Sequence, residues 1–323
     1  MSIFTRLIGE RQTRQDLEPL RKTLKWAKDI YAVGAPIPSH VFPPTEETAG
    51  YIIPTFFKYG ERAIAIDIAK WEASHQQPDG SFVAADGVPY TFDTAQVLRG
   101  FLSVVDAAPE FAEPLRRSAD YVASQIAPDG KVLTVSYDTW RVADGGMFSD
   151  YCHLYCLGPL REAGRRLSEP RYLDAADRGV RYYKRIADLV EFKPQLGTLS
   201  HIFGYMMEAL VELDEIELAK RGLKSAQAIQ KRSGAIPAYP SADWVCSTGM
   251  AQLAVAWYKL GMREPADKCV HYLETIQNAS GGFFGGYGRN AQYFPNQEIG
   301  WAAKYFLDCY LLKYGKNPLE DRN

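Results

Sequence analysis

The sequence repeats one pattern six times, and this repeat limits the possible folds more than any other feature. Six mostly apolar stretches each end at a glycine or an aspartate, at Gly60, Asp106, Gly164, Asp214, Gly261 and Gly315. Successive stops are 46 to 58 residues apart. Glycine or aspartate after an apolar helix is a typical C-terminal stop. A period near 50 residues fits two helices per unit, so the repeat predicts six helical hairpins.

A second motif recurs inside the units and consists of a glutamine followed by a glycine turn. It reads QQPDGSF at 76–82, QIAPDGK at 125–131, QKRSGA at 230–235 and QNASGGF at 277–283. The stretches before these turns are amphipathic with one charged face, over 61–76, 113–126, 215–230 and 263–278. The stretches after the turns are apolar on nearly all sides, over 47–59, 93–105, 149–163, 199–213, 247–260 and 297–313.

The two kinds of stretch predict two concentric rings of helices. A helix that is apolar all round is buried on every side, whereas an amphipathic helix has one face in solvent. We therefore expect an all-α fold, an (α/α)6 toroid with inner and outer helix rings. The toroid would be a single domain over residues 16–323, preceded by an N-terminal arm at 1–15.

Composition and charge exclude several classes of protein. The 37 basic and 39 acidic residues are spread along the chain, whereas a nucleic-acid binder shows a basic face. The sequence contains no run of 18 apolar residues, which is about the length that a membrane-spanning helix needs. Five cysteines without a secretion signal favour a reducing compartment, so a cytoplasmic location is expected. Residues 1–15 are either a basic amphipathic contact for lipid or a partner, or an arm folded onto the domain, which we favour.

The lengths of the connections indicate which end of the toroid carries the site. Connections from outer to inner helices are long, at 77–92, 127–148, 188–198, 231–246 and 279–296, and those from inner to outer helices are short. Long loops in a compact domain usually carry function. They lead into the N-termini of the inner helices, which favour anionic ligands. We call this end the mouth.

The repeats resemble the (α/α)6 scaffold of terpenoid cyclases, protein prenyltransferase β-subunits, six-hairpin glycosidases and uronate epimerases. The turn QQPDGSF is similar to the repeat motif of the cyclase and prenyltransferase branch. The run SGGFFGGYGRNAQYFPNQEIGWAAKYFLDCY at 280–310 resembles VpsJ-like proteins of bacterial polysaccharide biosynthesis. The scaffold resemblance covers nearly the whole chain and implies the fold. It leaves the reaction open, because one fold hosts many chemistries.

Polar residues begin the inner stretches and are the candidates for acid–base chemistry. They are Glu47, Asp93, Asp150, His201, Ser247 and Glu298. Acids with one histidine suit proton transfer to and from a sugar. Aspartate and serine are also preferred helix N-caps, so some of these residues would only close their helices. His201 could move a proton near neutral pH.

The sixth long loop is rich in glycine and aromatic residues and is a candidate ligand loop. Five glycines lie between 281 and 288, and glycine allows backbone to approach a ligand closely. Aromatic faces pack on sugar rings, and Arg289 could bind a carboxylate with two hydrogen bonds. The alternative is a turn that packs its aromatic side chains into the core. Further candidates are Phe284, Tyr287, Tyr293, Tyr239, Asp243 and Trp244, and more weakly Trp140 and Asp144.

Two family resemblances suggest other site residues. Prenyltransferase β-subunits bind zinc through an Asp-x-Cys and a later histidine, which implies Asp150, Cys152 and His201 here. Cys152 could equally be a small buried hydrophobe. Six-hairpin glycosidases of the unsaturated-uronyl type place a catalytic aspartate near a Tyr-x-x-x-Pro. Tyr155 and Pro159 have that spacing, but the aligned position is Cys152, so Asp93 or Asp150 would have to replace the aspartate.

The sequence thus favours a carbohydrate-active enzyme of polysaccharide or glycoconjugate biosynthesis, acting on an acidic sugar by epimerase, lyase or hydrolase chemistry. Expected catalytic residues are Asp93, Asp150, His201, Tyr287 and Glu298. Expected substrate-binding residues are Glu47, Tyr239, Asp243, Trp244, Phe284, Arg289 and Tyr293. No cofactor is expected. The alternatives are a zinc-dependent prenyltransferase-like or cyclase-like enzyme and a non-catalytic glycan-binding or assembly module.

Overall fold

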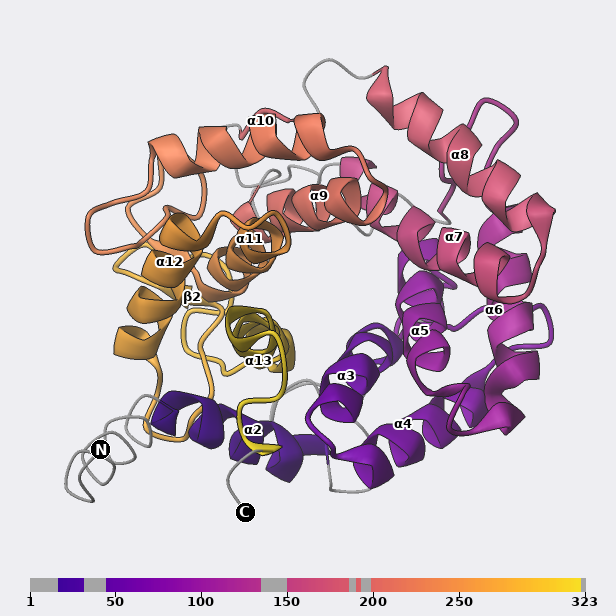
Figure 1. Cartoon of the computed structure of the whole chain (residues 1–323), viewed down its shortest axis with the longest axis horizontal. Helices are drawn as coiled ribbons and strands as arrows, with labels where there is room; N and C mark the ends of the chain where they lie inside the picture. Colours follow the sequence, from indigo (N-terminus) through magenta and orange to yellow (C-terminus); the bar gives the residue numbers. More distant parts are fainter. Residues whose placement is uncertain (1–16, 32–44, 135–149, 186–189, 193–198, 321–323) are drawn as a thin grey trace, which may run out of the picture.

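The computed structural model describes residues 17–31, 45–134, 150–185, 190–192 and 199–320. Within these ranges the inner ring comprises α3 (Glu46–Lys58), α5 (Thr91–Val104), α7 (Leu157–Arg166), α9 (Ser200–Glu212), α11 (Ser247–Lys259) and α13 (Gly300–Tyr314). The outer ring comprises α2 (Glu18–Tyr31), α4 (Arg62–His75), α6 (Ala112–Ser124), α8 (Pro170–Lys184), α10 (Ile216–Ala228) and α12 (Arg263–Ile276). Figure 1 shows the two rings around a common axis, which confirms the predicted (α/α)6 toroid.

The pattern of buried residues explains why a helix belongs to the inner or to the outer ring. Every residue of α9 from Ser200 to Leu210 is buried, as its all-round apolar sequence predicts. In α8 the buried residues form one stripe and the charged residues face outward. The third inner helix begins differently from the prediction, because a 3-10 segment, η3 (Asp150–Cys156), precedes α7. A second 3-10 turn, η1 (Pro109–Phe111), precedes α6.

The first and last helices close the ring. Helix α13 contacts both α2 and α3, so the end of the chain packs against its beginning (Figure 1). The Trp26 indole N–H on α2 donates to Glu298 Oε2 at 2.8 Å. Thr23 Oγ1 donates to the carbonyl of Gly281 at 2.9 Å. These contacts join segments more than 250 residues apart in sequence.

Three of the recurring glycine turns fasten an outer helix to the next one through a glutamine side chain. The Gln76 side-chain amide donates to the Pro114 carbonyl at 2.9 Å, and Gln230 bonds Pro265 in the same way at 3.0 Å. Gln277 makes the corresponding bond to Pro19 at 2.9 Å and thereby reaches α2. Each of these glutamines also donates, at 3.3 Å, to the carbonyl of the turn glycine four residues later.

The turn at 125–131 departs from this pattern. Its glycine is Gly130, so the residue four positions earlier is Ile126 and not Gln125. The side chain of Gln125 bonds Ser124 instead. The turn glycine itself is retained at all four sites. An added Cβ would lie 2.2 Å from the Arg117 carbonyl at Gly80 and 2.2 Å from the Arg178 carbonyl at Gly130.

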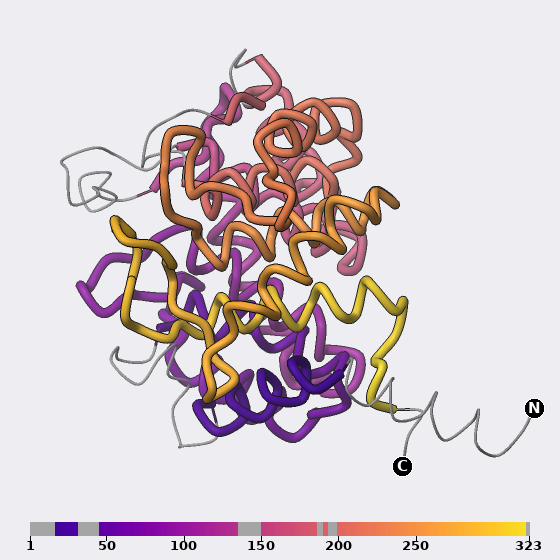
Figure 2. Tube along the Cα trace, turned by 90° about the vertical axis from the view of Figure 1, so that its left-hand side faces the viewer, coloured from indigo at the N-terminus to yellow at the C-terminus, as the bar shows by residue number. Residues whose placement is uncertain are grey.

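The long loops that the structure describes throughout, at 77–92, 231–246 and 279–296, lie at one end of the ring (Figure 2). Strands β1 (Val245–Cys246) and β2 (Gly286–Tyr287) pair antiparallel and join the fifth long loop to the sixth. In the side view of Figure 2 the sixth loop, at the boundary of orange and yellow, lies on one side of the ring, and the yellow C-terminal end of α13 lies on the other. None of the described helices is long and apolar enough to cross a bilayer.

Candidate functional site

Two carboxyl groups stand side by side at the mouth. Glu47 lies in the first turn of α3 and Asp93 in the first turn of α5, the helix packed against α3. Burial raises the pKa of Glu47 to about 7. Burial also raises the pKa of Asp93 well above its usual range, and the charge of Glu47 raises it further. Because ionisation of one acid opposes ionisation of the other, at least one of the two stays protonated near neutral pH.

A tyrosine and a histidine from α9 complete this group. The Tyr205 hydroxyl donates to Glu47 Oε1 at 3.2 Å, and its ring lies 4.6 Å from that of His201. Gln252 Oε1 lies 2.6 Å from His201 Nδ1, which assigns the proton to Nδ1 and leaves Nε2 as an acceptor. Burial lowers the pKa of His201 to about 4, so the imidazole is neutral at pH 7.

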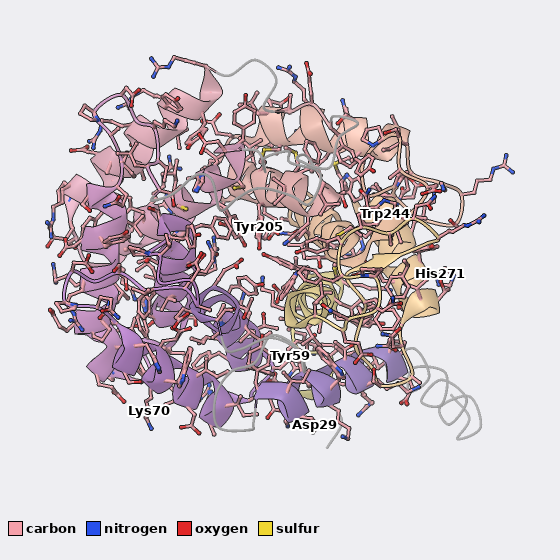
Figure 3. All side chains as sticks on the ribbon, turned by 180° about the vertical axis from the view of Figure 1, so that it is seen from behind. Asp29, Tyr59, Lys70, Tyr205, Trp244 and His271 are labelled. Atoms are coloured by element: carbon pink, nitrogen blue, oxygen red, sulfur yellow. The ribbon has the colours of Figure 1, made fainter. Side chains whose placement is uncertain are left out.

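Aromatic side chains line the axis beneath the carboxyl groups. Figure 3 shows Tyr205 beside the axis, in contrast to Lys70 and His271 at the rim of the ring. The ring of Tyr205 packs on those of Phe92, Tyr155 and Tyr305, with centroids 4.9, 5.0 and 6.3 Å apart. Aromatic walls beside carboxyl groups suit a ligand with an apolar ring face and hydroxyl edges.

Of the other predicted acids, Asp150 lies near this group and Glu298 does not contact it. The charges of both Asp93 and Asp150 raise the pKa of the Cys156 thiol, after the larger effect of burial. Asp150 accepts from His153 Nδ1 at 2.9 Å and lies 3.7 Å from Lys131 Nζ. The carboxylate of Glu298 bonds Trp26, Ser280 and Asn278 between α2 and the turn 277–283.

Tyr287 belongs with Glu298. Its hydroxyl donates to Asn278 Oδ1 at 3.1 Å and accepts from the backbone N–H of Phe284 at 2.9 Å. Burial raises its pKa, and the charge of Glu298 raises it further. The phenol thus stays protonated and engaged within its own loop. Both hydrogen bonds hold Tyr287 within the sixth loop. Among the described residues, no hydrogen bond joins Tyr287 to Glu47 or Asp93.

The predicted platform residues separate into two groups. Tyr293 lies at the mouth, with its ring 5.7 Å from His201 and its hydroxyl accepting from the Trp301 indole N–H at 3.0 Å. The remaining residues form the joined fifth and sixth loops. There Asn290 bonds Asp243, Tyr239 packs edge-on to the buried Trp244, Phe284 packs on Tyr287, and Arg289 is exposed. Trp140, Asp144 and the arm 1–15 lie outside the described residues.

The residues of the alternative zinc site have other surroundings in the structure. Cys152 is fully buried, and burial raises its pKa well above the usual range. Asp150 is engaged with His153, and His201 with Gln252. Across the described part of the chain no group of three or more His, Cys, Asp or Glu side chains is placed to hold a metal ion.

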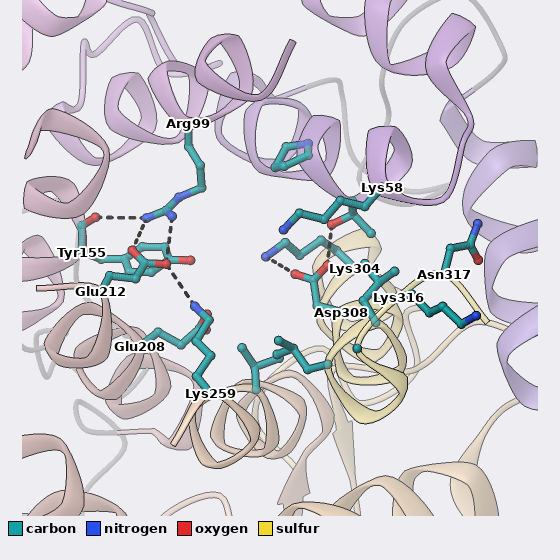
Figure 4. Close-up of a pocket in the computed structure, with 16 residues that line it drawn as sticks. Lys58, Arg99, Tyr155, Glu208, Glu212, Lys259, Lys304, Asp308, Lys316 and Asn317 are labelled. Carbon is teal, nitrogen blue, oxygen red and sulfur yellow. Dashed lines mark hydrogen bonds and ion pairs between the residues drawn. The ribbon is translucent and has the colours of Figure 1, made fainter. Parts of the chain in front are cut away.

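A cavity of about 510 Å³ at the opposite end of the ring was not predicted. Its charged lining is drawn in Figure 4 and consists of Lys58, Arg99, Glu208, Glu212, Lys259, Lys304, Asp308 and Lys316. We call it the far-end pocket. One sequence feature could have predicted this pocket. Charged residues such as Arg99 and Glu208 lie inside stretches that are otherwise apolar on all sides. Buried charges in such helices require partners or a ligand.

Comparison with known proteins establishes the fold by structure. No family model matches the sequence, and no curated protein matches it. The structure is similar to an unsaturated glucuronyl hydrolase from Bacillus sp. GL1, with a TM-score of 0.68 and 14% identity over 93% of this chain and 97% of that one. A polysaccharide lyase matches with a TM-score of 0.63 and 13% identity over 94% and 98%.

A third similar structure is an α-amylase from Clostridium perfringens, with a TM-score of 0.68 and 11% identity over 91% of this chain and 97% of that one. The chain therefore has the toroid fold found in these proteins along almost its entire length. Identities this low define the class of fold and leave the reaction to be argued from the site.

Proposed function

We propose that this protein is a carbohydrate-active enzyme that acts on an acidic sugar at the mouth by acid–base chemistry. The observation that carries the proposal is the pair of adjacent carboxyl groups, Glu47 and Asp93, both with raised pKa. Titratable groups perturbed by burial and by each other are typical of catalytic sites. The names of two similar structures, a glucuronyl hydrolase and a polysaccharide lyase, support an acidic sugar as the substrate class.

The two carboxyl groups would divide the roles of acid and base. Asp93 has the stronger cause to remain protonated, because the neighbouring charge of Glu47 adds to its burial. Asp93 would act as the general acid. Glu47, held by the Tyr205 hydroxyl, would act as the base once ionised. Neutral His201 would accept a hydrogen bond from a substrate hydroxyl at Nε2. Asp150 and Arg289 remain proposed residues for proton transfer and carboxylate binding.

The reaction would be epimerisation beside a carboxylate, lyase cleavage or hydrolysis, each of which requires an acid and a base. The biosynthetic setting rests on the VpsJ-like resemblance of residues 280–310 alone. A cytoplasmic location is supported by the five cysteines, all buried and none in a disulfide.

Substitution of each carboxyl group tests the proposal. A panel of uronate-containing oligosaccharides would be assayed by NMR for solvent hydrogen exchange, new unsaturation or cleavage. We expect Asp93→Asn and Glu47→Gln each to lower kcat on the identified substrate by about 10²–10⁴-fold, the usual contribution of a positioned acid or base. Glu217→Gln, an exposed change on α10, is the matched control and should retain full activity. Full activity in both mouth variants would overturn the assignment, and saturable binding without turnover would favour a glycan-binding module.

A further inference from the structure

The far-end pocket is separate from the mouth. Its walls come from the C-terminal parts of five inner helices, with Lys58 on α3, Arg99 on α5, Glu212 on α9, Lys259 on α11 and Asp308 on α13. Glu47 and Lys58 lie eleven residues apart on α3, which is roughly 16 Å along a helix. The buried tyrosines Tyr155 and Tyr305 lie near the axis, and Tyr155 forms part of the pocket wall. A ligand here would not contact the carboxyl pair at the mouth.

The lining carries two more positive than negative side chains, because five are basic and three are acidic. Arg99 donates to both oxygens of Glu212 at 3.0 and 2.9 Å, and Lys259 donates to the same carboxylate at 3.1 Å. Lys304 pairs with Asp308 at 2.9 Å. Figure 4 shows the amines of Lys58, Lys304 and Lys259 and the guanidinium of Arg99 directed into one space from different walls.

Lys58 contributes to this surplus of positive charge. It lines the pocket, is exposed to solvent, and has no hydrogen bond or ion pair with any residue that the structure describes. Its charge acts on Asp308, together with that of Lys304. An ammonium group that enters a cavity beside a second ammonium group favours an anion between them.

Glu208 gives a second, independent sign of a ligand. Its side chain is 2% exposed and lines the pocket, and its Oε1 has no hydrogen-bond partner among the described residues. The nearest cation, Lys259, lies 3.7 Å from the other oxygen. A buried polar atom without a partner is uncommon in folded proteins and indicates a group that the ligand would satisfy.

We propose that the far-end pocket binds a small dianion, a phosphate or sulfate group free or carried on a sugar, between Lys58 and Lys304, with Glu208 donating a hydrogen bond to it. With Glu208 protonated, the lining carries five basic and two ionised acidic side chains, and this surplus of positive charge favours a dianion. The protonated carboxyl of Glu208 supplies a donor that the carboxylate lacks. This site is independent of the proposed function at the mouth.

Calorimetric titration with inorganic sulfate, whose charge does not change between about pH 6 and 8, tests the proposal. We expect saturable binding that Lys58→Glu weakens at least about tenfold, since the substitution reverses a charge beside the anion. Lys70→Glu, the same charge change on the outer helix α4, is the control and should leave the affinity unchanged. Asp93→Asn should also leave it unchanged, which separates this site from the mouth.

The pH dependence tests the role of Glu208. Burial has the largest effect on Glu208 and raises its pKa to about 7. The charge of Glu212 also raises this pKa, whereas the charges of Lys259, Lys304 and Arg99 lower it. Affinity for sulfate should therefore be several-fold higher at pH 6 than at pH 8, and Glu208→Gln, which donates at both pH values, should remove the difference.

Glucose 6-phosphate and glucose 6-sulfate, each compared with glucose, would show whether a sugar bearing either anion also binds. Three results would overturn the proposal. They are no saturable sulfate binding, equal losses in Lys58→Glu and Lys70→Glu, or loss of binding in Asp93→Asn.

Discussion

At the residue scale, the mouth is defined by groups whose chemistry burial has changed. Glu47 and Asp93 are ordinary acids in the sequence, and their position at the starts of adjacent inner helices gives them raised pKa values. The same burial lowers the pKa of His201 to about 4, so its imidazole is neutral at pH 7. Burial of such a pair of acids has a cost in stability, because burial of an ionised carboxyl is unfavourable.

This cost predicts that Glu47→Gln stabilises the protein at alkaline pH. Between its ordinary pKa of 4.5 and about 7, folded Glu47 retains a proton that the unfolded chain releases, so stability falls as pH rises through this range. The variant lacks this loss. Its free energy of unfolding should exceed that of the native protein by up to about 3 kcal/mol near pH 8, and should match it near pH 4. Urea denaturation at both pH values measures the difference, which should not appear for Glu217→Gln.

At the scale of elements, the repeated glycine turns determine how neighbouring outer helices meet. Gly234 has φ of +93° and lies against the backbone of α12, where an added Cβ would be 2.0 Å from the Lys268 carbonyl oxygen. Gly261 also has positive φ, at +72°, but an added Cβ there would meet nothing within 4 Å. The two glycines thus share the left-handed conformation and differ in packing.

Comparison of alanine substitutions at these glycines separates strain from contact. Gly261→Ala should cost about 1–2 kcal/mol, the penalty for a side chain in the left-handed region. Gly234→Ala should cost at least about 3 kcal/mol, because overpacking against α12 adds to this penalty. Chemical denaturation measures both values. Equal losses would mean that the contact with α12 does not contribute.

At the scale of the whole molecule, stability depends on closing the ring. Helix α2 is the first described helix, yet it packs against α13 and the turn 277–283 through Trp26, Thr23 and Glu298. Glu298 accepts hydrogen bonds from α2 and from this turn, so its carboxylate bridges the two ends of the toroid.

We expect removal of this bridge to lower the stability of the fold and to leave the catalytic rate unchanged. Glu298→Ala leaves the Trp26 and Asn278 donors without their acceptor and should cost about 1–3 kcal/mol. The value of kcat per folded molecule should be retained below the melting temperature. Thermal unfolding and activity measured on one preparation decide between the two roles. A large fall in kcat at unchanged stability would instead support the predicted catalytic role of Glu298.

The sequence alone determined the helical architecture, because the period near 50 residues and the alternation of one-sided with all-round apolar stretches record local burial. It also indicated Asp93 and Glu47, since both begin inner helices. Only the tertiary structure showed that these two acids act on each other, that Glu298 and Tyr287 bond within and beside the closing loop, and that charges from five helices surround the far-end pocket. Such relations join residues distant in sequence, and the direction of a side chain around a helix axis is fixed by packing between helices, which no local pattern records.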